Sequence, residues 1–272
     1  MPITADYHLH TSFSGDATSS MEEMIQQGIR LGLTHMCFTD HYDYEFPNMG
    51  DLPEDYFIVN TDSYLYEFIR MREKYNGQIK LNFGIELGLQ PHLVRHSALY
   101  AKSFDFDFII GSSHVCNKKD PYYPEFYEGR SEEEAYREYF SSIIENIRTF
   151  TNFDVYGHLD YVVRYGPNKD REYTYEKYRD LLDQIIDLLL EKGKGIEINT
   201  GAVKAGLKEL HPCTALLKRY RDMGGEIITL GSDAHAASRI SADFDRAAEI
   251  LKECGFKYYT IFEKRMPEFK KL

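Results

Sequence analysis

Residues 6–16 read DYHLHTSFSGD and place two histidines, His8 and His10, at the end of an expected first strand. Side chains two positions apart on a strand point to the same face of the sheet. On an outer face such a pair is ordinary polar surface, whereas on an inner face two imidazoles call for a cation. The polar residues at the other strand ends therefore decide how this stretch is interpreted.

The length and composition favour one globular domain. The chain has 272 residues, of which 43% are hydrophobic and 28% charged, and this suits a protein with a substantial core. No linker rich in proline, glycine or serine divides it. An α/β barrel of about 250 residues commonly forms a single domain, so we expect one barrel domain over residues 1–272.

Charge and cysteine content limit the partners and the location. The net charge of −12 argues against a nucleic-acid-binding surface. No apolar run approaches the length of about 18 residues that a membrane span needs. Residues 1–10 lack the basic and apolar regions of a signal peptide. The four cysteines form no CxxC pair, which is typical of reduced thiols, and we expect a cytoplasmic protein.

Short apolar runs alternate with longer amphipathic segments along the chain. The expected strands are residues 3–9, 35–40, 79–87, 106–113, 153–158, 195–199 and 226–232. The clearest expected helices are residues 20–32, 62–75, 131–150, 174–193 and 241–255. Ser131 stands three residues before Glu134, in the spacing of a capping box. This alternation predicts an α/β fold with parallel strands joined by crossover helices, either closed into a barrel or open.

Metal-competent side chains cluster at the ends of the expected strands. In chain order they are His8, His10, His41, Glu86, His114, His158, Asn199, Asp233 and His235. Six of the ten histidines belong to this group, whereas His35, His92, His96 and His211 show no such pattern. The carboxyl ends of barrel strands meet at one mouth, where converging imidazoles and carboxylates would be poorly solvated without cations. The pattern therefore predicts a metal site.

The ordered set HxH, Asp16, TDH, Glu86, SSH, GHLD and GSDAH resembles the polymerase-and-histidinol-phosphatase superfamily of metal-dependent phosphoesterases. Within that superfamily the sequence is most similar to the histidinol-phosphate phosphatases, over residues 5 to about 255. Each short motif alone is weak, but their order is specific. The resemblance implies a distorted TIM-like barrel of seven strand–helix units, with a trinuclear metal centre at the C-terminal ends of the strands.

Carried over position by position, the resemblance implies three sets of metal ligands. One metal would be held by His8, His10, Glu86 and Asp233. A second would be held by Glu86, in a bridging position, with His114 and His158. The third would be held by Asp16, His41 and His235. Such mixed nitrogen and oxygen ligands suit zinc, manganese or iron, and the sequence does not choose among these metals.

The implied activity is hydrolysis of L-histidinol phosphate, a small phosphate monoester, to L-histidinol and phosphate in histidine biosynthesis. Three divalent cations would outweigh three carboxylates and favour a dianionic phosphate. A hydroxide bridging the first two metals would attack phosphorus in line. Beside the bridging Glu86, either Asp233 or His235 would handle protons.

Four residues are candidates for binding the substrate. Arg164 follows His158 by six residues, where the histidinol phosphatases carry an arginine that binds phosphate. Asp160 is a candidate for the substrate's ammonium or imidazole, with helix capping as the alternative. Lys204 is a weaker phosphate contact, and Asn199 lies at a strand end.

Other functions stay open at this point. A relative in the same superfamily could act on a nucleotide or on phosphotyrosine. An amidohydrolase also begins with HxH, but it carries a carboxylated lysine at a central strand end, where this chain has Glu86 and His114. A non-enzymatic, metal-stabilised scaffold is a further class, against which the intact ligand set counts. The oligomeric state cannot be inferred.

Overall fold

The computed structural model describes residues 3–47, 50 and 52–272. Residues 1–2, part of the N-terminal segment that was expected to lack a signal peptide, lie outside the described residues. Within the described residues, no helix combines the length and apolar character that a bilayer-spanning segment requires.

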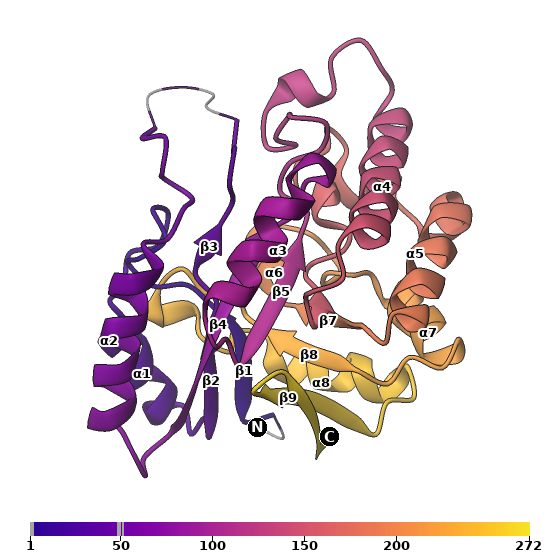
Figure 1. The fold of residues 1–272 in the computed structure, drawn as a ribbon. Helices are drawn as coiled ribbons and strands as arrows, with labels where there is room; N and C mark the ends of the chain where they lie inside the picture. Colours follow the sequence, from indigo (N-terminus) through magenta and orange to yellow (C-terminus); the bar gives the residue numbers. More distant parts are fainter. Residues whose placement is uncertain (1–2, 48–49, 51) are drawn as a thin grey trace.

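Seven parallel strands form a nearly closed barrel in which neighbours follow chain order (Figure 1). They are β1 (Ala5–Leu9), β2 (His35–Phe38), β4 (Lys80–Gly88), β5 (Phe108–Ser112), β6 (Val155–Tyr156), β7 (Gly195–Asn199) and β8 (Ile228–Gly231). The first and last strands meet just beyond their ends, where the His10 amide donates to the Ala234 carbonyl at 3.0 Å. The Asp233 amide donates to the His8 carbonyl at 2.9 Å. The expected α/β fold with a distorted TIM-like barrel is thus confirmed.

Helices cover the outside of the barrel, except that the short helix at residues 201–204 lies at the barrel mouth (Figure 1). They are α1 (Met21–Arg30), α2 (Thr61–Lys74), α3 (Val94–Ser103), α4 (Glu132–Thr149), α5 (Arg179–Glu191), α6 (Gly201–Lys204), α7 (Thr214–Asp222) and α8 (Phe244–Glu253). Short 3₁₀ turns lie at Pro91–Leu93, Pro124–Phe126, Tyr161–Arg164, Lys169–Arg171, Tyr175–Tyr178 and Ala237–Arg239. The expected capping box of Ser131 and Glu134 is present at the start of α4. Its reciprocal bonds satisfy backbone donors that a helix start leaves open.

Three strands were not anticipated from the sequence. The short β3 (His41–Tyr42) pairs with β4, and β9 (Tyr258–Glu263) forms an antiparallel hairpin with β10 (Met266–Lys271). The Phe262 carbonyl on β9 accepts bonds from the Tyr7 hydroxyl at 2.8 Å and the Asn82 amide at 3.0 Å. The hairpin therefore closes the N-terminal end of the barrel. β10 is largely exposed, so its sequence lacks the apolar alternation that identifies a half-buried strand.

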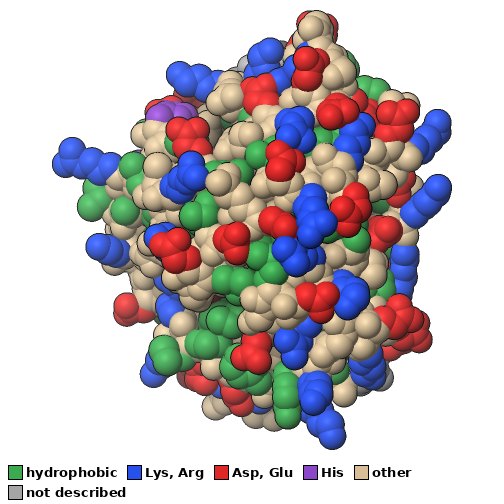
Figure 2. All heavy atoms as spheres, turned by 90° about the vertical axis from the view of Figure 1, so that its right-hand side faces the viewer, with side chains coloured by type: hydrophobic (Ala, Val, Ile, Leu, Met, Phe, Trp, Pro, Cys, Tyr) green, Lys and Arg blue, Asp and Glu red, His purple; other side chains and the backbone are tan. Residues whose placement is uncertain are grey.

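The barrel interior separates into an apolar layer and a polar layer. Near the N-terminal end, the Phe108 ring lies 5.3 Å from the Tyr7 ring and 5.0 Å from the Phe262 ring. Near the C-terminal ends of the strands, buried imidazoles and carboxylates replace these aromatic side chains. On the outer face that carries α5 and α7, acidic and basic side chains are interspersed (Figure 2). The unusual chemistry of the molecule therefore lies inside the barrel mouth.

Candidate metal centre

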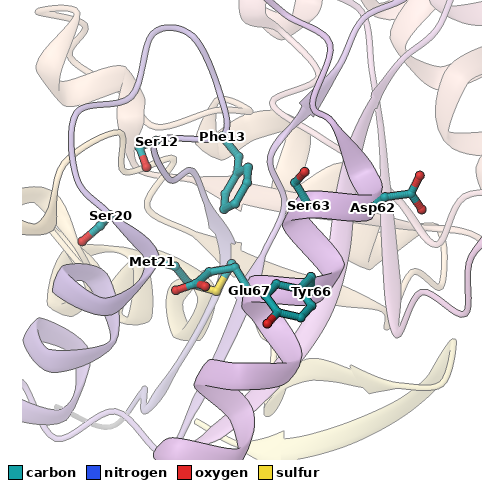
Figure 3. Close-up of a pocket in the computed structure, with 8 residues that line it drawn as sticks. All are labelled: Ser12, Phe13, Ser20, Met21, Asp62, Ser63, Tyr66 and Glu67. Atoms are coloured by element: carbon teal, nitrogen blue, oxygen red, sulfur yellow. The ribbon is translucent and has the colours of Figure 1, made fainter.

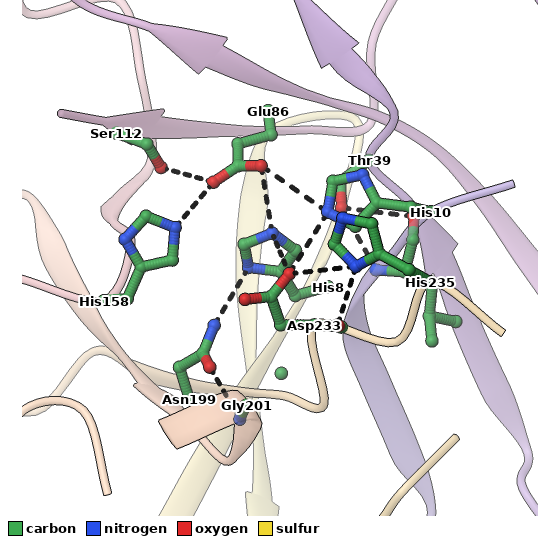
Figure 4. A network of polar contacts seen from close by, with 12 residues as sticks. His8, His10, Thr39, Glu86, Ser112, His158, Asn199, Gly201, Asp233 and His235 are labelled. Carbon is green, nitrogen blue, oxygen red and sulfur yellow. Dashed lines mark hydrogen bonds and ion pairs between the residues drawn. The ribbon is translucent and has the colours of Figure 1, made fainter. Parts of the chain in front are cut away.

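Glu86, at the C-terminal half of β4, lies at the middle of the polar layer and is fully buried (Figure 4). Its two carboxylate oxygens face two different groups of side chains. Oε2 faces imidazole nitrogens of His8, His10 and His41 at 3.2, 3.5 and 3.0 Å. Oε1 faces His158, His114 and the Ser112 hydroxyl at 2.8, 3.1 and 2.7 Å. This is the arrangement that a carboxylate bridging two cations requires.

The first group contains His8, His10, Glu86 and Asp233. The His10 Nε2 atom lies 3.5 Å from Glu86 Oε2 and 3.4 Å from Asp233 Oδ1. The His8 Nε2 atom lies 3.7 Å from the same Asp233 oxygen. In a tetrahedral site with metal–ligand distances of about 2.0 Å, neighbouring ligand atoms lie about 3.3 Å apart. The observed separations therefore match the edges of a coordination polyhedron.

The second group is smaller. The Nε2 atoms of His114 and His158 lie 3.4 Å apart, and both face Glu86 Oε1. Two imidazole nitrogens that point at one carboxylate oxygen again outline a position suited to a cation, once the imidazoles have lost their protons.

The third group lies nearer to solvent. Asp16 Oδ2 is 3.1 Å from His235 Nε2 and 3.7 Å from His41 Nε2. The His10 ring stacks on both the His235 and His41 rings, with centroids 4.1 and 4.2 Å apart. His41 faces Glu86 through Nδ1 and Asp16 through Nε2, so it connects the third group to the first.

Within the part of the chain that the structure describes, several buried atoms at the centre lack hydrogen-bond partners. They are His8 Nε2, His10 Nε2, His41 Nδ1 and Glu86 Oε2. An unsatisfied buried polar atom costs about 1–3 kcal/mol, so this concentration is unfavourable unless another group completes it. Divalent metal ions fit both the donor types and their spacing.

The pKa shifts in the centre also indicate that its buried carboxylates favour positively charged neighbours. Burial alone would raise the pKa of Glu86, but the imidazoles of His8, His114 and His41 hold it well below its usual range. Burial alone would lower the pKa of His114, but Asp43 and Glu86 raise it to about 10. Burial alone would also lower the pKa of His41, but the carboxylates of Asp16 and Glu86 raise it well above its usual value. Protons therefore take the place of cations when no metal is bound.

Metal affinity is expected to rise steeply with pH. The raised pKa values of His41 and His114 keep both imidazoles protonated at neutral pH, and a metal must displace those protons. For each proton that the metal displaces, the apparent metal affinity should fall by about tenfold when the pH is lowered by one unit. Competition against a chromophoric chelator between pH 8 and pH 6 measures this slope. An affinity that does not change over this range would contradict the assignment of these histidines as ligands.

Two outer carboxylates orient the imidazoles, and sequence reasoning did not find them. Glu197 Oε1 lies 2.6 Å from His8 Nδ1, and Asp43 Oδ1 lies 2.7 Å from His114 Nδ1. Such bonds fix the tautomer and leave Nε2 free for a metal. A Cβ atom on Gly231 would lie 2.1 Å from Glu197 Oε1, so only glycine leaves room there. The charged residue inside the apolar strand GIEIN was the available signal for Glu197.

The loop between β1 and α1 carries Asp16, and hydrogen bonds to Asp40 hold this loop in place. The Asp40 carboxylate accepts bonds from the Thr11 amide at 2.8 Å and the Ser14 hydroxyl at 2.6 Å. A Cβ atom on Gly15 would lie 2.4 Å from the Tyr56 carbonyl, so the SGD sequence permits a close approach. These contacts fix the loop so that Asp16 lies beside His235 and His41.

A cavity of about 490 Å³ opens above the candidate metal ligands, and two of the four expected substrate residues line it. Arg164 and Lys204 lie in its wall with Asp16, His41, His114, His158, Asp233 and His235. The Arg164 Nη2 atom is 3.4 Å from Asp233 Oδ2, so its guanidinium adjoins the ligand groups. Both cations are therefore placed where a phosphate above the centre could meet them.

The structure does not bring Asp160 and Asn199 into that cavity. Asp160 accepts bonds from His211 Nδ1 at 2.5 Å and the Cys213 amide at 2.9 Å, and it lines a neighbouring cavity of about 230 Å³. The Asn199 side chain lies behind His8, where its amide nitrogen is 3.5 Å from His8 Nδ1 (Figure 4). Asp160 therefore fastens the segment around His211, and Asn199 lies beside His8.

Another hollow lies between the N-terminal ends of α1 and α2 (Figure 3). Its lining consists of Ser12, Phe13, Ser20, Met21, Asp62, Ser63, Tyr66 and Glu67. The described residues of this lining include two carboxylates, Asp62 and Glu67, which lie apart from each other, and no imidazole (Figure 3). We therefore place the chemistry of the molecule in the barrel mouth.

Comparisons with known proteins agree with this geometry. The PHP domain family model matches residues 6–201. A histidinol-phosphatase from Lactococcus lactis is 33% identical, with 94% of this chain and 93% of that protein covered. A probable histidinol-phosphatase from Clostridium acetobutylicum is 30% identical, with 97% and 98% covered.

Solved structures extend the comparison. The crystal structure of the Lactococcus lactis histidinol phosphate phosphatase, complexed with zinc, L-histidinol and phosphate, has a TM-score of 0.89 and 32% identity, with 97% of this chain and 98% of that chain covered. A putative histidinol phosphatase from Listeria monocytogenes has a TM-score of 0.75 at 17% identity, which shows the shared fold alone. With its barrel, its ordered motifs and a family match over more than half of its length, the chain belongs to the PHP domain family.

Proposed function

We propose that this chain is a metal-dependent phosphomonoesterase that hydrolyses L-histidinol phosphate to L-histidinol and phosphate, a reaction of histidine biosynthesis. The observation that carries the proposal is the buried cluster around Glu86, in which several converging nitrogen and oxygen atoms have no hydrogen-bond partner among the described residues. Similarity over nearly the whole chain to a histidinol phosphatase that binds zinc, L-histidinol and phosphate supports the choice of substrate.

We infer three metal ions, with zinc favoured over manganese or iron by the zinc in the Lactococcus lactis structure. The first ion would be held by His8, His10, Glu86 and Asp233. The second would be held by Glu86, His114 and His158. The third would be held by Asp16, His41 and His235. Bound divalent metals supply Lewis acidity, which neutralises phosphate oxygens and lowers the pKa of coordinated water.

Arg164 is proposed to bind the phosphate. Burial alone would lower the pKa of this guanidinium, but Tyr165 and Asp233 raise it above its usual value, so it stays charged. A guanidinium can donate two parallel bonds to a phosphate. Lys204, in the same cavity wall, is proposed as a second cation for the phosphate.

Asp233 and His235 are proposed to move the proton that the leaving alkoxide needs. His235 Nδ1 lies 3.0 Å from the Asp233 backbone carbonyl and 3.6 Å from Asp233 Oδ1, so the two residues adjoin each other at the cavity. His235 is partly exposed in the cavity, whereas Asp233 is almost fully buried. We therefore expect His235 to be the member of the pair that faces the leaving group.

The described barrel is proposed to be one domain, since β8 returns to β1 and completes the barrel mouth. The four cysteines are buried and free, which supports the expected cytoplasmic location.

A substrate comparison tests the proposed function. The metal-reconstituted protein is assayed by phosphate release from L-histidinol phosphate, a nucleoside monophosphate and phosphotyrosine. The highest kcat/KM is expected for L-histidinol phosphate. A clear preference for the nucleotide or phosphotyrosine would instead assign the chain to another phosphatase within the family. Absence of phosphate release with any of zinc, manganese or iron would reject the phosphatase function.

A further inference from the structure

One carboxylate in the wall of the metal cavity has no role in the scheme above. Asp120 lines this cavity and is only 8% exposed. Its Oδ1 atom accepts the Tyr122 amide at 2.8 Å. Among residues 3–47, 50 and 52–272, no lysine, arginine or histidine forms an ion pair with it, and its second oxygen has no hydrogen-bond donor.

An unpaired carboxylate at such a depth is unfavourable for the free protein. Burial raises the pKa of Asp120 to about 6, against the opposing backbone bond from Tyr122. Charges taken from water normally occur with a partner. A ligand that brings a cationic N–H donor into the cavity would supply that partner.

Aromatic rings surround the same part of the cavity. Tyr122, Tyr123, Tyr161 and Tyr165 all line it together with Asp120. The Tyr122 and Tyr165 rings lie 5.3 Å apart, and the Tyr161 and Tyr165 rings lie 5.1 Å apart. Aromatic faces attract cations and stack with flat heterocycles, so this wall suits a cationic group attached to a ring.

We propose that Asp120 determines specificity by accepting an N–H bond from the substrate's ammonium group, while the tyrosine wall packs against its imidazole. The inference rests on the proposed function and deepens it, because it assigns the part of the site that recognises the amino-alcohol portion. The cavity then offers complementary charges to both ends of the substrate. Arg164 and Lys204 match the phosphate, and Asp120 matches the amine.

The substitution Asp120→Asn tests the proposal with little structural change, since an asparagine oxygen can still accept the Tyr122 amide. Three substrates are compared: L-histidinol phosphate, its analogue imidazolylpropyl phosphate without the amine, and para-nitrophenyl phosphate. For L-histidinol phosphate, kcat/KM is expected to fall by about 100-fold, mainly through KM. For the other two substrates it is expected to change by less than about threefold. Calorimetric titration with L-histidinol in the presence of phosphate should show a matching loss of affinity.

Glu125→Gln is the matched control, because it removes one carboxylate from the same loop at an exposed position outside the cavity lining. It should behave like the wild type with all three substrates. Equal losses for Asp120→Asn on all three substrates would overturn the proposal in favour of a structural role. Equal losses on L-histidinol phosphate and its amine-free analogue, with para-nitrophenyl phosphate unaffected, would assign Asp120 to the imidazole and would also overturn the proposal.

A wild-type preference for L-histidinol phosphate that survives in Asp120→Asn would overturn the inference alone. A wild type without any preference for L-histidinol phosphate over para-nitrophenyl phosphate would overturn the proposed function, and the inference with it.

Discussion

Replacing Glu86 by glutamine is expected to remove metal and phosphatase activity together. The carboxylate faces two ligand groups, with His8 and His10 on one oxygen and His158 on the other. An amide has the same shape but presents a neutral oxygen to one group and a poor ligand, NH₂, to the other. Replacing a residue that only hydrogen-bonds to a metal ligand lowers metal affinity or activity by about 10- to 100-fold. Glu86 is itself the candidate bridging ligand, so we expect kcat/KM to fall by more than about 1000-fold.

Elemental analysis of the purified variant, together with its kinetics, measures both effects. Glu145→Gln provides a control, because Glu145 is exposed on α4, away from the barrel mouth. Circular dichroism reports whether the Glu86 variant is folded. If Glu86→Gln turned over at the wild-type rate while depleted of metal, the metal-dependent scheme would be wrong.

Replacing Arg164 by alanine is expected to lower activity while leaving the metals in place. The guanidinium lies 3.4 Å from Asp233 and lines the cavity, but it offers no lone pair to a metal. Removing a preorganised donor to a developing anion costs about 100- to 1000-fold in kcat. The expected result is therefore a loss of that size with the metal content of the wild type.

Arg164→Lys is the informative companion, because it keeps the charge but loses the paired donors. We expect it to recover part of the alanine variant's loss, measured as kcat and KM for L-histidinol phosphate. Wild-type kinetics in both variants would remove Arg164 from the phosphate site. Loss of metal from the alanine variant would mean that Arg164 supports the ligands instead.

Much of the fold was accessible from the sequence because local patterns and chain order agree. Apolar runs marked the seven barrel strands, and the alternation with amphipathic helices required parallel pairing. Because carboxyl ends of parallel strands meet at one mouth, the residues that follow them converge regardless of their distance in sequence. His8 and Asp233 are an example, since their backbones are joined across the closing strands.

The parts that were not anticipated depend on pairings without a local signature. Asp43 approaches His114 across 71 positions, and Glu197 approaches His8 across 189 positions. Asp160 follows His158 by only two residues, yet the path of the chain there turns it toward His211. The exposed strand β10 shows no apolar alternation, because the hairpin covers the barrel with β9 alone.

The rate of L-histidinol phosphate hydrolysis, measured against the number of metal ions bound per chain, tests directly whether the barrel mouth is a three-metal phosphatase centre. Metal-free protein is reconstituted stepwise with zinc, and separately with manganese, and bound metal is counted by elemental analysis. We expect negligible turnover without metal and full turnover only when the third ion binds. Full turnover in the metal-free protein, or a maximum reached with a single ion per chain, would contradict it.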